Sequence, residues 1–127
     1  MKLTKYEQVL LDGWEETHKK SQLTFWILFS LHNKGRHMNS IKETIHMLLN
    51  NTFTVDDQSM YRALRRLDDA ELIEHKMIPN QNGPNLKMYY LTTIGMNVLR
   101  AFSDRNVSSV YFKPEIEKQL IKLQERK

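Results

Sequence analysis

Cysteine is absent from the 127-residue chain, and glycine and proline are scarce, with four and three residues respectively. The lack of cysteine excludes disulfide bonds and any zinc or iron–sulfur site with thiolate ligands, and it suits a reducing cytoplasm. The four glycines are not clustered, so no glycine-rich phosphate-binding loop is expected. The function of this protein therefore requires neither a glycine-rich phosphate-binding loop nor a metal site with cysteine ligands.

Long apolar runs are also missing. The longest, around 25–29, is far shorter than the roughly 20 residues that a membrane span requires. The segment 1–11 alternates charged and apolar residues and lacks the apolar region of a secretory signal, so we expect none. We therefore expect a cytoplasmic protein that makes no membrane contact and has one hydrophobic core, because 127 residues are too few for two.

No residue pattern typical of catalysis or of metal binding is found. Ser59 has no glycine-flanked elbow and no base that the sequence identifies. None of the histidines has a carboxylate at the spacing of a zinc site, and these histidines are His18, His32, His37, His46 and His75. We expect no catalytic residue, no metal, no cofactor and no enzymatic activity.

The spacing of apolar residues predicts six helices and one β-hairpin. Helices are expected over 4–20, from 21 to about 31, from 39 or 40 to 49, over 56–70, from 93 or 94 to 102, and from 114 onwards. The period changes from 3.6 to 2 over 73–78 and 86–91, which predicts two strands, and a loop is expected over 106–113. The expected helix N-caps are Asn39 or Ser40, Thr54, and Thr92 or Thr93.

Three helices followed by a hairpin and a helix predict a winged helix-turn-helix, mostly α with a small β-hairpin (α+β), with extra N-terminal and C-terminal helices. The expected domains are an N-terminal amphipathic helix over 1–20 that contributes to a dimer contact, a winged-helix DNA-binding domain over 21–104, and a C-terminal loop and short dimerisation helix over 105–127. The net charge of +4 is compatible with a polyanionic partner but mild, so the positions of the charges matter more.

The helix over 56–70 is the expected recognition helix. Met60, Leu64 and Leu67 share its core face. The opposite, water-facing side carries polar side chains, namely Gln58, Arg62, Arg65 and Asp69, flanked by Tyr61 and Arg66. Arginine can donate two hydrogen bonds to guanine O6 and N7, glutamine can pair with adenine, and both can hold a phosphate. The pattern indicates a helix that binds double-stranded DNA.

The same helix permits a second interpretation, in which its arginines bind its own acids. The segment 56–71 carries five acids against three arginines. On an ordinary solvated helix the arginines would pair with the acids that follow them, Asp68, Asp69 and Glu71. Asp56 and Asp57 cap the N-terminus of the segment and the other acids follow the arginines, which leaves a positive surface at its centre. This arrangement favours the DNA-binding interpretation.

Two stretches resemble one family of regulators. Residues 59–73, SMYRALRRLDDAELI, are similar to the recognition-helix signature of PadR-type transcriptional regulators. Residues 83–95, GPNLKMYYLTTIG, resemble the wing of that family and its Tyr-x-Leu-Thr-x-x-Gly junction. The two motifs have the order and separation found in the family, and the resemblance extends over roughly 23–102. It implies a homodimer that binds an inverted-repeat operator near its target promoter and is released by a signal.

The resemblance implies six DNA contacts on the recognition helix, namely Gln58, Ser59, Tyr61, Arg62, Arg65 and Arg66. The first two would lie closest to the base edges, the next two would contact the backbone or bases, and the last two would hold phosphate. Lys87 would be the single lysine of the wing. Many relatives have a His-Gly-Tyr-Glu-Ile-like string where this chain has HMNSI over 37–41, so Asn39 stands where a tyrosine would grip the backbone.

Apolar residues of the two terminal helices are the expected dimer contacts. In the family a C-terminal helix usually forms the dimer, but the segment 114–127 is short, so we expect the N-terminal helix to share the interface. The expected interface residues are Tyr6, Leu10, Trp14, Ile116, Leu120 and Leu123. The alternative is that the N-terminal helix folds back on the core of its own chain.

We therefore expect a sequence-specific regulator of transcription, a repressor that acts as a homodimer on double-stranded DNA at the nucleoid. Two alternatives stay open: an architectural or replication-terminator-like roadblock on DNA, and a winged-helix protein–protein adaptor. The resemblance also suggests a small-molecule inducer, so Trp14 and Trp26 either line an inducer pocket or pack in the protein.

Overall fold

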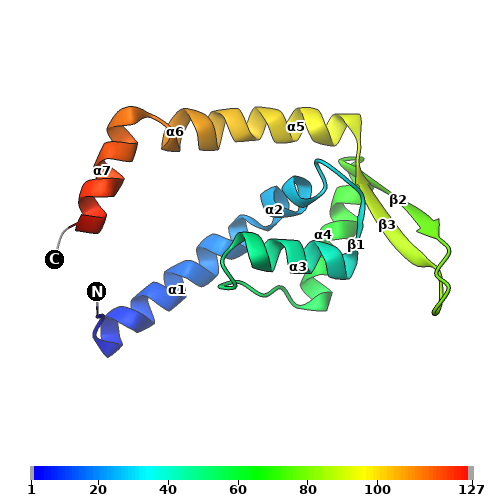
Figure 1. Ribbon diagram of the computed structural model, residues 1–127, viewed down its shortest axis with the longest axis horizontal. Coiled ribbons are helices and arrows are strands. Elements are labelled where there is room, and N and C mark those ends of the chain that lie inside the picture. The colour runs from blue at the N-terminus through cyan, green and yellow to red at the C-terminus, as the bar shows by residue number, and fades with distance from the viewer. Residues whose placement is uncertain (1, 126–127) are drawn as a thin grey trace.

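The computed structural model describes residues 2–125. Figure 1 shows helices gathered at the centre, a β-hairpin that projects at one end, and two helical arms at the other. In chain order the elements are α1 (Lys5–Ser21), α2 (Leu23–Ser30), β1 (Arg36–His37), α3 (Met38–Leu48), α4 (Asp57–Asp69), β2 (Ile73–Ile78), β3 (Leu86–Leu91), α5 (Thr93–Ser103), a π-helical segment (Asp104–Ser108), α6 (Ser109–Tyr111) and α7 (Pro114–Glu125).

The sheet is antiparallel, with three strands in the order β1–β3–β2. β2 and β3 form the predicted hairpin with the predicted bounds, and their register sets His75 opposite Tyr89. β1 is not predicted by the sequence, because two residues are too few to show an alternating pattern. The predicted winged helix-turn-helix, mostly α with a small β-hairpin, is confirmed, with β1 as an addition to the sheet.

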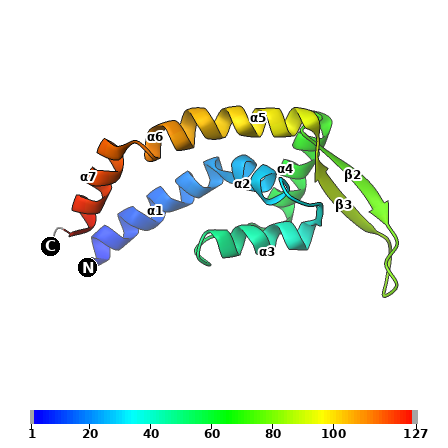
Figure 2. The same cartoon turned by 45° about the horizontal axis from the view of Figure 1, so that its top comes forward.

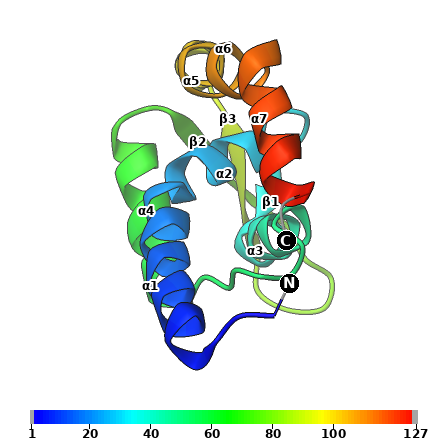
Figure 3. The same ribbon diagram turned by 90° about the vertical axis from the view of Figure 1, so that its left-hand side faces the viewer.

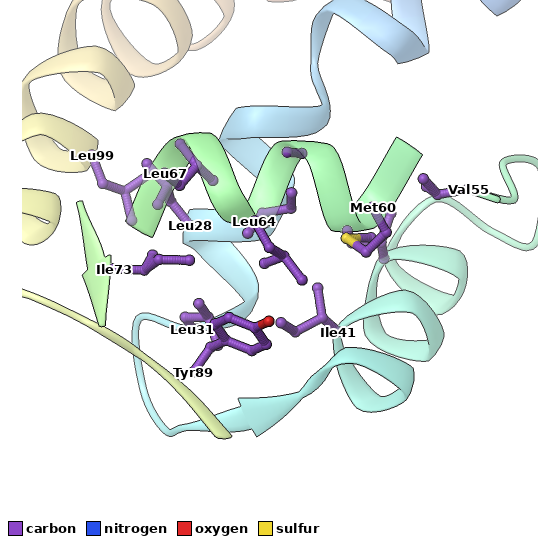
Figure 4. Close-up of a cluster of buried hydrophobic side chains, with 13 residues drawn as sticks. Leu28, Leu31, Ile41, Val55, Met60, Leu64, Leu67, Ile73, Tyr89 and Leu99 are labelled. Atoms are coloured by element: carbon purple, nitrogen blue, oxygen red, sulfur yellow. The ribbon is translucent and has the colours of Figure 1, made fainter. Parts of the chain in front are cut away.

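The hydrophobic core lies between α2, α3, α4 and the sheet. Figure 4 shows labelled side chains from these elements meeting beneath α4. The largest fully buried side chains are Ile27, Ile41, Ile45, Met60, Leu64 and Ile73. Each side chain of this size stabilises the fold by about 1.5–3 kcal/mol when it leaves water. One face of α4 is therefore anchored in the core, and its other face is free for function.

α3 begins earlier than the sequence predicts. The chain is extended through His37 because β1 pairs with β3 up to that residue. The ring nitrogen Nδ1 of His37 accepts a hydrogen bond from the backbone N–H of Ser40 at 3.3 Å, and helix α3 starts at Met38. The predicted cap at Asn39 or Ser40 is therefore wrong, and the strand that moves the cap is the one that the sequence did not reveal.

The predicted loop over 106–113 is wrong for most of its length. The π-helical segment and α6 continue α5, so the chain stays helical over 93–111. The segment 104–113 contains no glycine and no proline that would end a helix. The break comes at Lys113, because a residue that precedes proline avoids the helical conformation, and α7 then starts at Pro114 as predicted.

α1 and α7 extend from the winged-helix region on the side opposite the hairpin (Figures 1 and 2). Figure 3, which looks from that side, shows α1 and α7 apart from each other. Neither α1 nor α7 contains a buried residue within the part of the chain that the structure describes. The alternative in which the N-terminal helix folds back on its own core is therefore not observed.

Candidate nucleic-acid interface

α4 has one apolar face and one polar face, as the 3.6-residue period predicts. Met60, Ala63, Leu64 and Leu67 are buried against the core. The long polar side chains of the predicted DNA-binding set are all exposed, and these are Gln58, Tyr61, Arg62, Arg65 and Arg66. The sequence therefore assigned the faces of this helix correctly.

The N-terminus of α4 is capped by Asp56, as expected from the two acids at this end, and not by Thr54, because the chain stays extended while Val55 is buried in the core. The Asp56 carboxylate accepts hydrogen bonds from the backbone N–H and the hydroxyl of Ser59, both at 2.8 Å. These two bonds lower the pKa of Asp56, and the charge of Arg62 adds a smaller lowering. Ser59 lies at the predicted end of the helix, but its hydroxyl already has a partner within the cap.

Asp57, the next acid of the helix, binds Lys42 of α3 through an ion pair. The pair links the two helices of the helix-turn-helix motif and occupies a carboxylate that the arginines would otherwise attract. An acid in the first turn also complements the partial positive charge of a helix N-terminus. The sequence did not identify Lys42, because its partner lies fifteen residues away on a different helix.

Asp68, in the last turn of α4, binds a histidine of the hairpin. The Nδ1 atom of His75 in β2 lies 2.5 Å from the Oδ2 atom of Asp68. Over residues 2–125 no carboxylate oxygen lies within 4.0 Å of a guanidinium nitrogen of the three α4 arginines, Arg62, Arg65 and Arg66. The alternative in which these arginines are neutralised by the following acids is therefore not observed in this part of the chain.

Lys87 lies on the face of the hairpin that turns toward α4. Lys87 and Tyr89 are two residues apart in β3 and so share a face, and Tyr89 is buried in the core. Burial, followed by the charge of Asp68, raises the pKa of the Tyr89 hydroxyl, which therefore stays protonated at neutral pH. A hollow of about 290 Å³ between α4 and the hairpin is lined by Tyr61, Leu64, Arg65, Asp68, Asp69, His75, Lys87 and Tyr89.

Two further polar residues are Lys76 in the hairpin and Asn39 in α3. The hairpin carries a second lysine, Lys76, which lies on the opposite face with its ammonium group 5.3 Å from the centre of the Tyr90 ring. The prediction of a single lysine in the wing is therefore wrong, because β2 adds one. Asn39 is exposed in the first turn of α3, the helix that precedes α4.

The predicted dimer residues are mostly exposed. On α1, Tyr6, Leu10 and Trp14 have exposed fractions of 72%, 54% and 76%. On α7, Leu120 and Leu123 are exposed and Ile116 is half-buried. Exposed stripes of large apolar side chains are typical of surfaces that another molecule covers.

A second hollow, of about 490 Å³, lies between α2 and the helical arm formed by α5 and α6. Its aromatic walls are Phe25, Trp26, Phe29, Phe102 and Tyr111. Phe25 contacts three of the other rings, with centroid distances of 4.9 Å to Trp26 and 5.7 Å to both Phe29 and Phe102. Trp26 therefore both packs against the core and lines this hollow, whereas Trp14 is not among its lining residues.

Within residues 2–125 no three histidine, aspartate or glutamate side chains gather closely enough to hold a metal ion. Four histidines have hydrogen-bonding partners in the chain itself, namely His32, His37, His46 and His75. In the same described range no helix combines the length and the apolar content needed to cross a membrane.

Comparison with known proteins gives a family and a fold. Residues 27–101, more than half of the chain, match the model of the Transcriptional regulator PadR-like family. No curated protein gives a significant match. Among solved structures, a transcriptional regulator from Clostridium thermocellum has a TM-score of 0.63 at 14% identity, with 87% of this chain and 96% of that chain covered. A PadR family transcriptional regulator from Eggerthella lenta has a TM-score of 0.63 at 18% identity, with 96% and 97% covered.

A third solved structure is Bacillus subtilis PadR in complex with operator DNA, with a TM-score of 0.60 at 23% identity. The aligned region covers 66% of this chain and 48% of that chain. Identities this low show a shared fold. The family match over 27–101 starts within α2 and ends within α5, so it contains the helix-turn-helix and the hairpin. Fold, recognition helix and family match agree, and the chain belongs to the PadR-like family of transcriptional regulators.

Proposed function

We propose that this family member binds double-stranded DNA in a sequence-specific way, with α4 in the major groove and the hairpin along the backbone. One observation carries the proposal: Arg62, Arg65 and Arg66 are exposed on α4, and none has a carboxylate within 4.0 Å in the described part of the chain. The major groove of DNA admits an α-helix, and arginine recognises both guanine edges and phosphates. The complex of Bacillus subtilis PadR with operator DNA supports this reading of the fold.

The proposed DNA contacts divide by position on this surface. Gln58 and Ser59 at the N-terminus of α4 lie nearest to the base edges, with Ser59 restricted by its bond to Asp56. Tyr61 and Arg62 contact the backbone or bases, and Arg65 and Arg66 hold phosphates. Lys87 contacts phosphate from the hairpin, and Asn39 approaches the backbone from α3.

We infer that the protein acts as a homodimer on an inverted repeat. The apolar stripes of α1 and α7 both lie at the end of the molecule opposite the hairpin, so a partner that covers them leaves the hairpin free (Figure 1). A two-fold dimer reads two half-sites about one helical turn of DNA apart. In this scheme residues 21–104 bind DNA, while 1–20 and 105–127 form the dimer.

We further propose that the protein represses transcription at the nucleoid and that a small apolar molecule acts as its inducer. The hollow between α2 and the α5–α6 arm has the aromatic walls that a flat apolar ligand requires. It lies beside the arms assigned to the dimer, so a ligand there would change how the two DNA-binding units are held. The family and the solved relatives are transcriptional regulators, and we assign this chain no enzymatic role.

The two alternative functions differ in what they require. A protein–protein adaptor requires that the α4 arginines be held by Asp68, Asp69 and Glu71, and residues 2–125 contain no such ion pair. The regulator is therefore preferred over the adaptor. A roadblock on DNA would use the same contacts and would differ only in where its sites lie, so footprinting across a genome distinguishes it from a regulator of promoters.

The decisive experiment selects bound duplexes from a random pool and then tests α4 directly. The wild type should enrich an inverted repeat, and the Arg62→Ala, Arg65→Ala, Arg66→Ala triple variant should bind the selected duplex at least about a hundredfold more weakly, since each arginine supplies one or more charged contacts. The control removes three exposed cations that are not among the proposed DNA or dimer contacts, Arg100, Arg105 and Lys118, and its mass is measured to verify that it keeps the oligomeric state of the wild type. Equal affinity of the wild type and the α4 variant would refute the assignment.

A further inference from the structure

We propose that His75 is a positioning residue for DNA binding. It holds Asp68 away from Arg65, and its charge decides whether the hollow between α4 and the hairpin has a net positive charge or none. This inference rests on the proposed DNA binding by α4. It assigns a role to a hairpin histidine that neither the family match nor the helix pattern identifies.

Asp68 is bound by a residue of the hairpin and not by an arginine of its own helix. Asp68 follows Arg65 by three residues, a spacing at which aspartate and arginine pair on an exposed helix surface. The Asp68 carboxylate instead lies 2.5 Å from His75 Nδ1, and it is not within 4.0 Å of any arginine of α4. The two side chains are 26% and 40% exposed, so the pair is less screened by solvent than a fully exposed one. The Asp68 carboxylate therefore binds His75 and not Arg65.

Charged groups from α4 and β3 line the same hollow as His75. From α4 the hollow receives the cation Arg65 and the carboxylates Asp68 and Asp69. From β3 it receives the cation Lys87 and the hydroxyl of Tyr89, whose pKa is raised by burial. Two cations thus oppose two carboxylates, and the imidazole of His75 decides whether the hollow is neutral or positive.

Three other groups near His75 do not change this balance. Glu74 and Lys76 flank His75 in β2, but alternate residues of a strand point to opposite faces, so both lie on the far side of the hairpin. They also carry opposite charges. The phenol of Tyr61, which lines the hollow from α4, contributes a hydrogen-bonding group and not a cation.

The charges of this hollow would act on a DNA phosphate. A phosphate that approaches between the recognition helix and the wing meets Arg65, Lys87 and the Asp68 carboxylate together. An imidazole ring is either neutral or a cation with two N–H donors. A charged His75 neutralises Asp68 and leaves both cations to the phosphate, whereas a neutral His75 leaves the carboxylate to repel it. Because acidification favours the charged imidazole, DNA affinity is expected to rise as the pH is lowered.

The test measures the affinity of the full chain for the selected duplex and for a mixed-sequence duplex of the same length, between pH 6 and pH 8 at constant salt. The variants are His75→Ala, His75→Gln, Asp68→Asn and the His75→Ala, Asp68→Asn double variant. Asp69→Asn is the matched control, because Asp69 lines the same hollow without contacting His75. Circular dichroism verifies that each variant is folded, and His75→Gln keeps a polar group at the position if the alanine variant unfolds.

His75→Ala and His75→Gln should bind both duplexes about three- to tenfold more weakly than the wild type at pH 6, the size expected for one charge in a partly exposed site. Asp68→Asn should restore most of this loss in the His75→Ala background and should change the wild type far less. The rise in affinity toward pH 6 should be reduced in every variant that lacks His75 or Asp68 and retained in Asp69→Asn.

Three results would overturn the inference: wild-type affinity and pH profile in both His75 variants, an equal gain from Asp68→Asn with and without His75, or His75 ring resonances that Asp68→Asn leaves unmoved in an NMR spectrum without DNA. The NMR comparison does not depend on DNA. A wild type that binds no duplex would instead refute the proposed function, and with it this inference, so the two failures are distinguishable.

Discussion

The ammonium group of Lys42 in α3 binds the carboxylate of Asp57 in the first turn of α4. This contact joins the two helices of the helix-turn-helix at the end of α4 that lies nearest to the bases in the proposed complex. It also occupies an acid that lies on the same helix as the three arginines. A single ion pair thus contributes both to the position of the recognition helix and to its charge.

Removing this pair tests its contribution to stability. Lys42→Met should lower the free energy of unfolding by about 0.5 kcal/mol, because the Asp57 side chain is 62% exposed and solvent screens the pair. The measurement is urea denaturation of Lys42→Met, Asp57→Asn and the double variant. The control is Lys20→Met, which breaks the more exposed Lys20–Glu16 pair and should change stability less. A coupling of several kcal/mol between Lys42 and Asp57 would contradict this account.

Base contacts and phosphate contacts should respond differently to alanine substitution. If Arg62 reads a base, Arg62→Ala should cost about 1–3 kcal/mol of binding free energy and relax the sequence preference at one position of the half-site. Lys87→Ala should weaken binding to all sequences alike and reduce the slope of log affinity against log salt by about one. Titrations with selected and scrambled duplexes at several salt concentrations separate the two outcomes. The roles are assigned incorrectly if Lys87→Ala alters the sequence preference.

A pair of glycine substitutions tests the junction between the hairpin and α5. A Cβ atom on Gly95 would lie 2.0 Å from the backbone oxygen of Leu72, so Gly95→Ala should destabilise the protein by about 1–3 kcal/mol or more. Gly13 has no atom within 4 Å of such a Cβ, and Gly13→Ala in the middle of α1 should stabilise it by about 0.5–1 kcal/mol. Thermal unfolding of both variants is the measurement, and a shift of the same sign in the two would be inconsistent with the structure.

The dimer proposal predicts a change of mass. The Leu10→Glu, Trp14→Glu double variant places two charges in the apolar stripe of α1 and should sediment as a monomer where the wild type sediments as a dimer, because unpaired charges are costly to bury in an interface. Lys5→Glu, which changes charge on α1 outside the stripe, should leave the dimer intact. A variant that stays dimeric would remove α1 from the proposed interface.

The cap of α4 predicts loss of stability in acid. The hydrogen bonds from Ser59 hold the pKa of Asp56 below its ordinary value of 3.8, so the folded state favours the carboxylate. The contribution of the Asp56 carboxylate to stability is fully present above the ordinary pKa of 3.8, and it is lost as the pH falls through the lowered pKa of the folded state. Asp56→Asn keeps a capping group without a titrating proton, so its melting temperature should depend less on pH below about pH 4. Identical acid profiles for the wild type and Asp56→Asn would contradict the assigned cause.

Much of the fold could be predicted because it depends on local patterns. The strands at 73–78 and 86–91, the start of α7 at Pro114 and the faces of α4 all follow from the period of apolar residues and the chemistry of turn formers. The errors occur where a contact distant in sequence overrides the local signal. β1 moves the cap of α3 to His37, and the burial of Val55 selects Asp56 over Thr54 among the expected caps of α4.

By itself the sequence determined the order of the longer helices and of the two hairpin strands, the family, and the exposure of the arginines on one helix, because each depends on residues a few positions apart. Only the tertiary structure decided which charges meet. Asp57 binds Lys42, and Asp68 binds His75, because core packing brings α3 and the hairpin beside α4. An acid near an arginine in the sequence can pair with whichever cation the fold brings closest, and that choice leaves the arginines of α4 without carboxylate partners in the described part of the chain.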